Sequence, residues 1–453
     1  MKYIKIYLII IVFFCVSGFL CGCSDDGGTP EEDAGSSDKK EDSGTAPSED
    51  AGEEEEGPPD LPDSCEREGN RLNFEELDTS HEKGDVKWFD VTRGPEVFAA
   101  AWVQKVVNED EWGLFAGFVS EDFKTTGSFV DIAPDPAFAA GPAIIWNEDA
   151  YIIMWRDARW NSSCTQSSSC GTDLAMVSID ENGVMEGTVN RITTGGNVTG
   201  RPVMLKHDEG IIALWLEQET GALNEGSIFA IAMSSEGEIT GQRKKISGDS
   251  EAMELPFSAA ADKDGVIVAW MGRNENGFLI QKIDRNADMV GSSVRVDTGN
   301  LVQKVNIKSR GTGGYYAAWS QKTGDSLSGT EIYSAQINKN LKIGGEILQH
   351  SWTDGNALNP ALAEADDGWV VLWDSDRAQG ASKCRDKMCT LDVYFQLAED
   401  SGEPLTHPLR VTEDRNQCSR GTAFSVDDGF IVFWVATRQY REALFARKVQ
   451  CSL

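Results

Sequence analysis

Residues 264–270 read Asp-Gly-Val-Ile-Val-Ala-Trp, a tight-turn dipeptide followed by four apolar residues and a tryptophan. Close copies of this heptapeptide occur at 209–215, 313–319, 367–373 and 428–434. A sixth copy, at 149–155, has alanine in place of glycine, and a looser seventh copy ends at Trp102. Asp-Gly between two apolar runs is typical of a β-hairpin, because glycine reaches positive φ without a steric penalty. Each copy therefore predicts two strands joined by a tight turn.

The spacing of these copies indicates a larger repeating unit. Their tryptophans lie 49 to 61 residues apart, at Trp102, Trp155, Trp215, Trp270, Trp319, Trp373 and Trp434. Further strand-like and turn-like pieces recur between them. Four strands per unit, repeated seven times, resemble the β-propeller folds. We therefore predict an all-β domain over residues 65–453, a seven-bladed propeller of four-stranded antiparallel blades. No named functional family is recognised, because the WD40, kelch and sialidase repeat signatures are absent.

The last repeat is one strand short, which predicts how the ring closes. Two strands flank Trp434, a third covers residues 444–449, and the chain then ends. We expect an N-terminal strand near residues 71–77 to complete this blade, since pairing the two ends removes an exposed sheet edge. The repeated tryptophans are interpreted as core between blades.

The N-terminus has the features of an export signal. Two lysines precede an apolar run from Ile6 to Leu20, which is short for a membrane-spanning helix. The run ends Leu20-Cys21-Gly22-Cys23, which resembles the lipobox of bacterial lipoproteins. The resemblance implies a signal peptide over residues 1–22 and a lipid on Cys23, with palmitate as one acyl group. The lipid bilayer is then a partner through this anchor, and the expected location is the bacterial cell envelope. The outer membrane is favoured, with the protein facing the periplasm or the cell surface.

Residues 23–64 are expected to form a disordered acidic tether after the lipidated cysteine. Residues 24–64 hold 16 acidic side chains against two lysines and almost no large apolar side chains. Such a segment cannot bury enough apolar area to offset its chain entropy, and its like charges repel. The whole chain has a formal net charge of −33, which argues against nucleic acid as a partner.

The cysteines fit an oxidising compartment. Cys164 and Cys170 are close in sequence, as are Cys384 and Cys389, and each pair is predicted to form a loop-closing disulfide. Cys65 and Cys451 flank the proposed ring closure, so a bridge between them would lock it. Cys418 is then left over, and the pairings Cys418–Cys451 and Cys65–Cys418 stay open. A zinc site is disfavoured, because no histidine is near either close pair, so neither a metal nor another cofactor is predicted.

Candidate ligand residues come from two similar loops. One contains Asp157, Arg159 and Trp160, and the other contains Asp376 and Arg377. Arginine with nearby aspartate could bind a carboxylate or a sugar, although local Arg–Asp pairing that pins each loop is favoured. No catalytic residue is assigned. The preferred function is a non-catalytic module that binds a protein or a glycan, and the alternative is a propeller-type glycoside hydrolase or lyase.

The lipoprotein hypothesis predicts that Cys23→Ser abolishes acylation, because the thiol is the group that carries the lipid. Metabolic labelling with palmitate is expected to mark the native chain and not this variant. Cys21→Ser is the matched control and is expected to keep the label. Labelling of Cys23→Ser at the native level would contradict the hypothesis.

Overall fold

The computed structural model describes a large part of the chain after residue 60. The described ranges are 61–62, 64–74, 85–105, 112–124, 129–133, 139–161, 171–218, 226–247, 257–263, 265–272, 276–310, 313–323, 329–352, 355–376, 391–412, 418–438 and 441–452. Contacts divide the chain into two units, Met1–Glu55 and Glu56–Leu453, and every described residue belongs to the second. No helix within the described ranges has the length and apolar character needed to cross a membrane.

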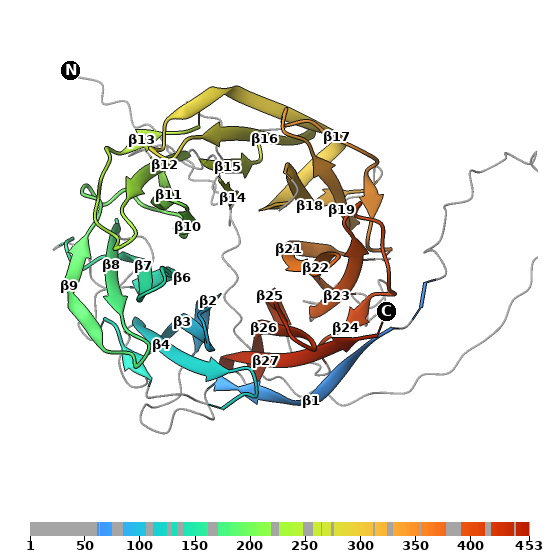
Figure 1. Ribbon diagram of the computed structural model, residues 1–453, viewed down its shortest axis with the longest axis horizontal. Coiled ribbons are helices and arrows are strands. Elements are labelled where there is room, and N and C mark those ends of the chain that lie inside the picture. Colours follow the sequence, from blue (N-terminus) through green and yellow to red (C-terminus); the bar gives the residue numbers. More distant parts are fainter. Residues whose placement is uncertain are drawn as a thin grey trace, which may run out of the picture. The chain divides into compact units, whose positions relative to one another are not determined.

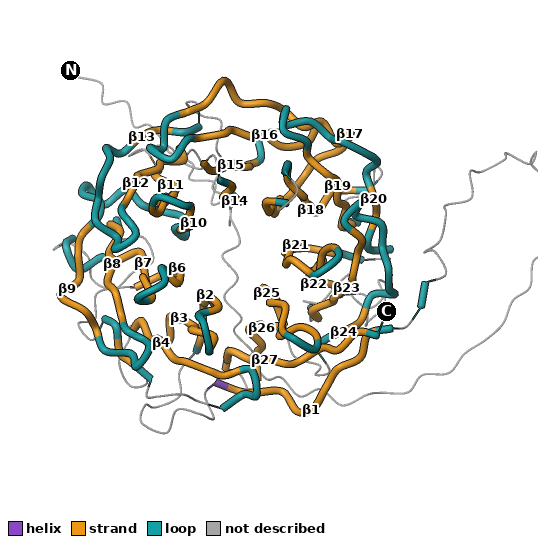
Figure 2. The backbone as a smooth tube through the Cα atoms, viewed as in Figure 1, coloured by secondary structure: helices purple, strands orange, loops and turns teal. Residues whose placement is uncertain are grey.

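The described residues are almost all strand or loop (Figure 2). The first sheet contains β2 (Val86–Arg93), β3 (Val97–Lys105), β4 (Trp112–Ser120) and β5 (Val130–Asp131). The second contains β6 (Ala139–Trp146), β7 (Tyr151–Asp157), β8 (Asp173–Ile179) and β9 (Met185–Arg191). The third contains β10 (Val203–His207), β11 (Gly210–Gln218), β12 (Gly226–Met233) and β13 (Lys244–Lys245).

Two further four-stranded sheets lie at the C-terminal end of the chain. One contains β21 (Ala357–Ala365), β22 (Gly368–Ser375), β23 (Asp392–Glu399) and β24 (Leu409–Arg410). The other contains β25 (Cys418–Val426), β26 (Gly429–Arg438), β27 (Arg441–Cys451) and β1 (Cys65–Asn73). All strand pairs are antiparallel, and within this unit the sheets stand around a ring with the first strand of each nearest the middle (Figure 1).

The middle of the chain forms one seven-stranded sheet. It contains β14 (Ser258–Asp262), β15 (Gly265–Trp270), β16 (Asn276–Ile283), β17 (Met289–Ser309), β18 (Tyr315–Lys322), β19 (Thr330–Ile337) and β20 (Leu348–Gln349). The N-terminal part of β17 pairs with β16, and its part from Val302 to Ser309 pairs with β18. The propeller with four-stranded antiparallel blades is therefore present, but the prediction of seven separate sheets is wrong. The described residues form five four-stranded sheets, and one long strand joins the remaining strands into a sixth sheet.

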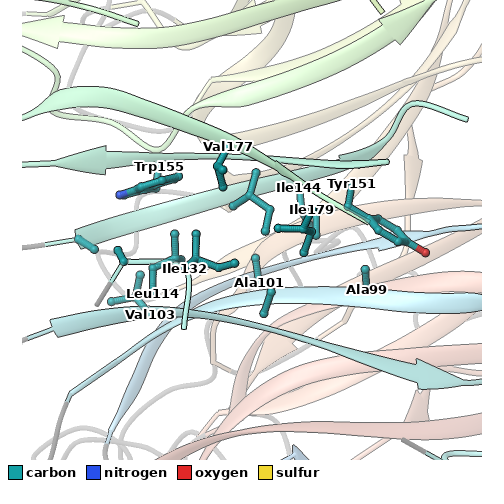
Figure 3. Close-up of a cluster of buried hydrophobic side chains, with 14 of the residues drawn as sticks. Ala99, Ala101, Val103, Leu114, Ile132, Ile144, Tyr151, Trp155, Val177 and Ile179 are labelled. Carbon is teal, nitrogen blue, oxygen red and sulfur yellow. The ribbon is translucent and has the colours of Figure 1, made fainter. Parts of the chain in front are cut away.

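The repeated tryptophans fill the space between sheets, as the sequence predicts. The six from Trp155 to Trp434 are among the largest fully buried side chains. In the first core cluster, side chains of β3 and β4 pack against those of β6, β7 and β8 (Figure 3). Several indole N–H groups donate to the side chain two residues later, as in Trp155 to Asp157 at 2.8 Å and Trp215 to Glu217 at 2.7 Å. These bonds satisfy a donor that would be costly to bury alone.

The turn glycines are required by a close approach within each sheet. Gly265 has φ of 141°, and a Cβ built on it would lie 2.2 Å from the carbonyl oxygen of Ile283 on the third strand. Gly429 has φ of 144° and would meet the carbonyl oxygen of Val449 at 2.3 Å. The predicted glycine requirement is confirmed, and its cause is the third strand as well as the turn itself.

The two ends of the described chain pair with each other. β1 is antiparallel to β27, with Cys65 opposite Cys451, and a disulfide joins these two residues. The predicted bridge is therefore confirmed. The closing strand covers Cys65–Asn73, so its predicted position near 71–77 is wrong by several residues. Cys418 is a buried thiol at the opposite end of the same sheet, so the two alternative pairings are excluded. Burial raises the pKa of this thiol to about 12.

Opening the Cys65–Cys451 bridge is expected to destabilise the domain. Replacing both cysteines with serine should lower the free energy of unfolding by roughly 2–4 kcal/mol, because the unfolded chain loses a very long covalent loop. Urea titration of the native and doubly substituted domains measures this. Cys418→Ala, which removes a buried thiol but no bridge, is expected to cost only about 1 kcal/mol. Identical unfolding midpoints with and without the bridge would show that closure does not depend on it.

Candidate functional site

Polar side chains gather where the innermost strands begin. We define the axial cluster as Arg201, Lys304, Asn359, Asp374 and Arg420. Arg201 lies two residues before β10, Lys304 lies in β17, Asn359 in β21 and Arg420 in β25, while Asp374 is near the end of β22. In an antiparallel sheet the beginning of one strand and the end of the next lie at the same edge. The five residues therefore occupy one end of the ring.

Asp374 is the buried centre of this cluster, with 0% of its surface exposed. The side-chain N–H of Asn359 donates to its Oδ2 at 2.7 Å. The backbone N–H of Arg420 donates to both carboxylate oxygens at 3.1 Å. Burial raises the pKa of Asp374 to about 6, although these hydrogen bonds and the charges of Lys304 and Arg420 act in the opposite direction. One carboxylate thus holds segments of two neighbouring sheets.

Asn359 and Arg420 both have left-handed backbone conformations, with φ of 53° and 63°. Each lies in a β-bulge, where the pairing register shifts between Leu358 and Ala361 and between Ser419 and Thr422. A left-handed conformation costs an arginine roughly 1–2 kcal/mol and an asparagine less, and a bulge redirects a side chain. Strained backbone of this kind is concentrated at functional sites. The hydrogen bonds to Asp374 are what hold these two conformations in place.

Lys304 connects the cluster to the next sheet. Its Nζ donates to Oδ1 of Asn359 at 3.1 Å, so the Asn359 amide bridges Lys304 and Asp374. Burial lowers the pKa of Lys304 to about 8, the positive charges of Arg420 and Arg201 lower it further, and Asp374 raises it. Within the described part of the chain, neither Lys304 nor Arg420 has a carboxylate within salt-bridge distance. Their positive charges are therefore not neutralised by a direct ion pair with a described carboxylate.

Two carboxylates border the axial cluster. Arg201 forms an ion pair with Asp90 of β2 at 2.5 Å. Glu442 of β27 is half-buried, and burial raises its pKa while the charges of Arg420 and Lys87 lower it. A carboxylic acid of raised pKa is a better proton donor to a ligand, and an amine of lowered pKa is a better proton acceptor. The arrangement can bind an anion and can supply both a proton donor and a proton acceptor.

The residues predicted from the two loops have mostly local partners. Asp157 is buried, accepts the indole N–H of Trp155, and pairs with Nε of Arg159 at 2.8 Å. The guanidinium of Arg159 lies 5.7 Å from the centre of the Trp160 ring. Asp376 is buried and accepts the backbone N–H of Asn356 at 2.8 Å. Arg377 lies outside the described residues, so a ligand site shared by both loops stays a prediction.

The predicted lipidation and the two predicted loop disulfides involve cysteines that the structure does not describe. Cys23, Cys164, Cys170, Cys384 and Cys389 lie outside the described residues, and their predicted roles stay predictions. Within the described ranges, no group of three or more His, Cys, Asp or Glu side chains is arranged to hold a metal ion.

One position of the repeat relates three members of the axial cluster in the sequence. In four repeats the residue 14 places before the repeated tryptophan begins a dipeptide with proline or glycine. These dipeptides are Gly141-Pro142, Arg201-Pro202, Asn359-Pro360 and Arg420-Gly421. Gly141, at the same place in the second repeat, also has positive φ, 55°. At this position the second repeat has glycine, and the other three repeats have a charged or amide side chain.

Comparisons with known proteins give no family. No family model matches the sequence, and no curated protein matches it. Similar solved structures include Pyrococcus horikoshii acylaminoacyl peptidase, with 11% identity and TM-score 0.37, covering 80% of this chain and 59% of that chain. Trypanosoma rangeli sialidase with 2,3-difluorosialic acid has 10% identity and TM-score 0.47, covering 82% and 55%. The polysaccharide lyase Uly1 has 8% identity and TM-score 0.49, covering 82% and 90%.

The chain thus spans less than two thirds of the peptidase and sialidase chains that it resembles. Identities and TM-scores this low carry no argument about activity.

The raised pKa of Asp374 predicts a pH-dependent stability. A carboxyl with a higher pKa in the folded state favours folding when protonated, and this contribution is lost as pH rises through about 6. The native domain is therefore expected to lose about 2–3 kcal/mol relative to Asp374→Asn between pH 4 and pH 7. Urea unfolding of both proteins across this range measures the difference. A difference that does not vary with pH would show that Asp374 does not titrate there.

Proposed function

We propose that the domain is a carbohydrate-active enzyme, of the glycoside hydrolase or lyase class, that binds an acidic sugar at the axial cluster. The supporting observation is the convergence of Lys304, Arg420 and Arg201 in a chain with a net charge of −33. Three cations that repel one another, two of them without an ion pair among the described residues, favour an anionic ligand. The sequence alone favoured a non-catalytic module, and this proposal replaces that preference.

The chemistry of the cluster favours a carboxylate on a sugar. A guanidinium presents two parallel N–H donors to a carboxylate, and a lysine adds a point charge. The Asn359 amide adds a donor and acceptor of the kind that binds hydroxyl groups. An extended phosphate backbone would meet the acidic remainder of the protein, so a nucleic acid is disfavoured.

Two proton-transfer groups support catalysis. Glu442, with its raised pKa, would act as the general acid that a hydrolase needs at the glycosidic oxygen. Lys304, whose pKa burial lowers to about 8, would act as the base in its neutral form, while Arg420 and Arg201 hold the sugar carboxylate. It would take the proton beside that carboxylate in a lyase, or a proton of the attacking water in a hydrolase, and Glu442 would in both cases give its proton to the leaving glycosidic oxygen. Arg420 acts electrostatically on both residues, so one bound carboxylate would be near each of them.

A non-catalytic binding module is the second candidate. The hydrogen bonds from Asn359 and Arg420 occupy Asp374, which is fully buried and cannot touch a ligand. Its role is to position its neighbours, and a binding site would need this support as much as a catalytic site. Binding of acidic sugars without any product would favour this candidate.

Two finer expectations belong to the same proposal. We treat the seven-stranded sheet as two blades that share β17, which gives the ring seven radial units. We also retain attachment through a lipid on Cys23 to a bacterial envelope membrane, which would place the enzyme beside extracellular or periplasmic glycans.

Arg420→Asn is expected to weaken binding of acidic sugars by about 10- to 100-fold, the loss of one charge-assisted contact. Asparagine tolerates positive φ, so the bulge is retained. Calorimetric titration with uronates and sialate measures affinity, and ultraviolet absorbance of a new double bond separates a lyase from a hydrolase.

Lys206→Met is the matched control and is expected to leave affinity unchanged, because Lys206 pairs with Glu148 at the turn end of β10. If acidic sugars bound the Arg420→Asn and native proteins equally well, the axial cluster would not be the site.

A further inference from the structure

A pair of half-buried tryptophans lies close to the axial cluster. Trp88 is in β2 and Trp112 begins β4, and their ring centres are 6.3 Å apart. We call these two residues the tryptophan pair. Both keep part of their surface in solvent, whereas the repeated tryptophans from Trp155 to Trp434 are fully buried. Part of each ring packs against the first core cluster and against Ala140 and Ala158, and the rest of each ring stays in contact with solvent.

Lys87 links this pair to the axial cluster. Its Nζ lies 4.4 Å from the centre of the Trp112 ring and 6.0 Å from that of Trp88. Its carbonyl oxygen accepts a hydrogen bond from the guanidinium of Arg420. The charge of Lys87 also lowers the pKa of Glu442. The tryptophan pair, Lys87, Glu442 and Arg420 therefore form one continuous group.

We propose that Trp88, Trp112 and Lys87 form a second sugar subsite beside the axial cluster, so that the ligand is an acidic oligosaccharide rather than a single sugar. This inference rests on the proposed function. An indole presents a flat apolar face with a polar edge, which suits the mixed surface of a sugar ring. Lys87 supplies a second cation at the place where the next acidic group along a glycan would lie.

The dimensions and charge of this group favour a glycan over a protein. Two indoles and a lysine offer a small contact area, whereas specific protein interfaces bury about 1,200–2,000 Å² in total. Lys87 and the three cations of the axial cluster add positive charge at one place in a chain that is strongly acidic as a whole. An acidic oligosaccharide matches both the narrow apolar surface and the local charge.

The test compares chain lengths of one acidic sugar. Galacturonate oligomers of increasing length and sialate oligomers are titrated calorimetrically against the native domain. The second sugar is expected to raise affinity by about 3- to 10-fold. Trp112→Ala is expected to remove this gain and to leave affinity for the single sugar unchanged. Trp112→Phe should keep part of the affinity gain from the second sugar. This result would also show that the domain still folds with a substitution at position 112. Lys87→Met should reduce the preference for a charged over a neutral second sugar.

Trp146→Ala is the matched control. Trp146 is also half-buried, but it is the last residue of β6, at the end of the strand away from the axial cluster, where it packs against Tyr151. This variant is expected to keep the dependence on chain length. Suppose that Trp112→Ala and Lys87→Met also keep the dependence on chain length, while Arg420→Asn loses binding of the single sugar. The second subsite would then be wrong, and the proposed function would stand. If no acidic sugar of any length bound the native domain, both would be overturned.

Discussion

The packing of each sheet against both neighbours is the constraint on which the structure depends. A strand that is apolar on both faces has no side to turn toward water, so each sheet must be covered twice. The repeated tryptophans fill the gaps between sheets, and the indole N–H groups of Trp155 and Trp319 are satisfied by side chains two residues later. An open row of such sheets would leave two faces uncovered. Closure into a ring packs these two uncovered faces against each other. This is why the two ends of the described chain must pair.

The axial cluster is a product of the same constraint. Sheets that stand around a ring bring their first strands together, so residues from distant repeats meet at one end. The bulges at Asn359 and Arg420 then redirect side chains that would otherwise follow the regular alternation of a strand. Asp374 stabilises both bulges from within the protein, and Lys304 reaches them from the neighbouring sheet. Local strain is thereby concentrated where an anionic ligand would be held.

Much of the fold could be predicted from the sequence because the repeats carry strong local signals. Asp-Gly turns, apolar runs and the tryptophan spacing predicted antiparallel units, and the positions of Cys65 and Cys451 predicted the bridge. The continuous strand β17 could not be foreseen, since Arg295 to Leu301 contains residues that suit a turn. The candidate site was also missed. Its members are separated by up to 219 positions, from Arg201 to Arg420. Only Arg201, Asn359 and Arg420 share a distance from a repeated tryptophan, and nothing in the sequence relates Lys304 to them. Asp157 and Asp376 looked equally promising in sequence, but Asp157 binds Trp155 and Arg159 beside it, and Asp376 accepts the backbone N–H of Asn356.

The covalent link between β1 and β27 has a mechanical consequence. Cys65 is the first residue of its strand, and it is joined to the last residue of the strand it pairs with. Without that link, tension applied to the chain ahead of Cys65 would peel β1 away one hydrogen-bonded rung at a time. With the first rung covalent, peeling cannot start, and the load passes directly into the ring. A domain held in this way keeps its ring closed under a pull that would unzip an unlinked strand.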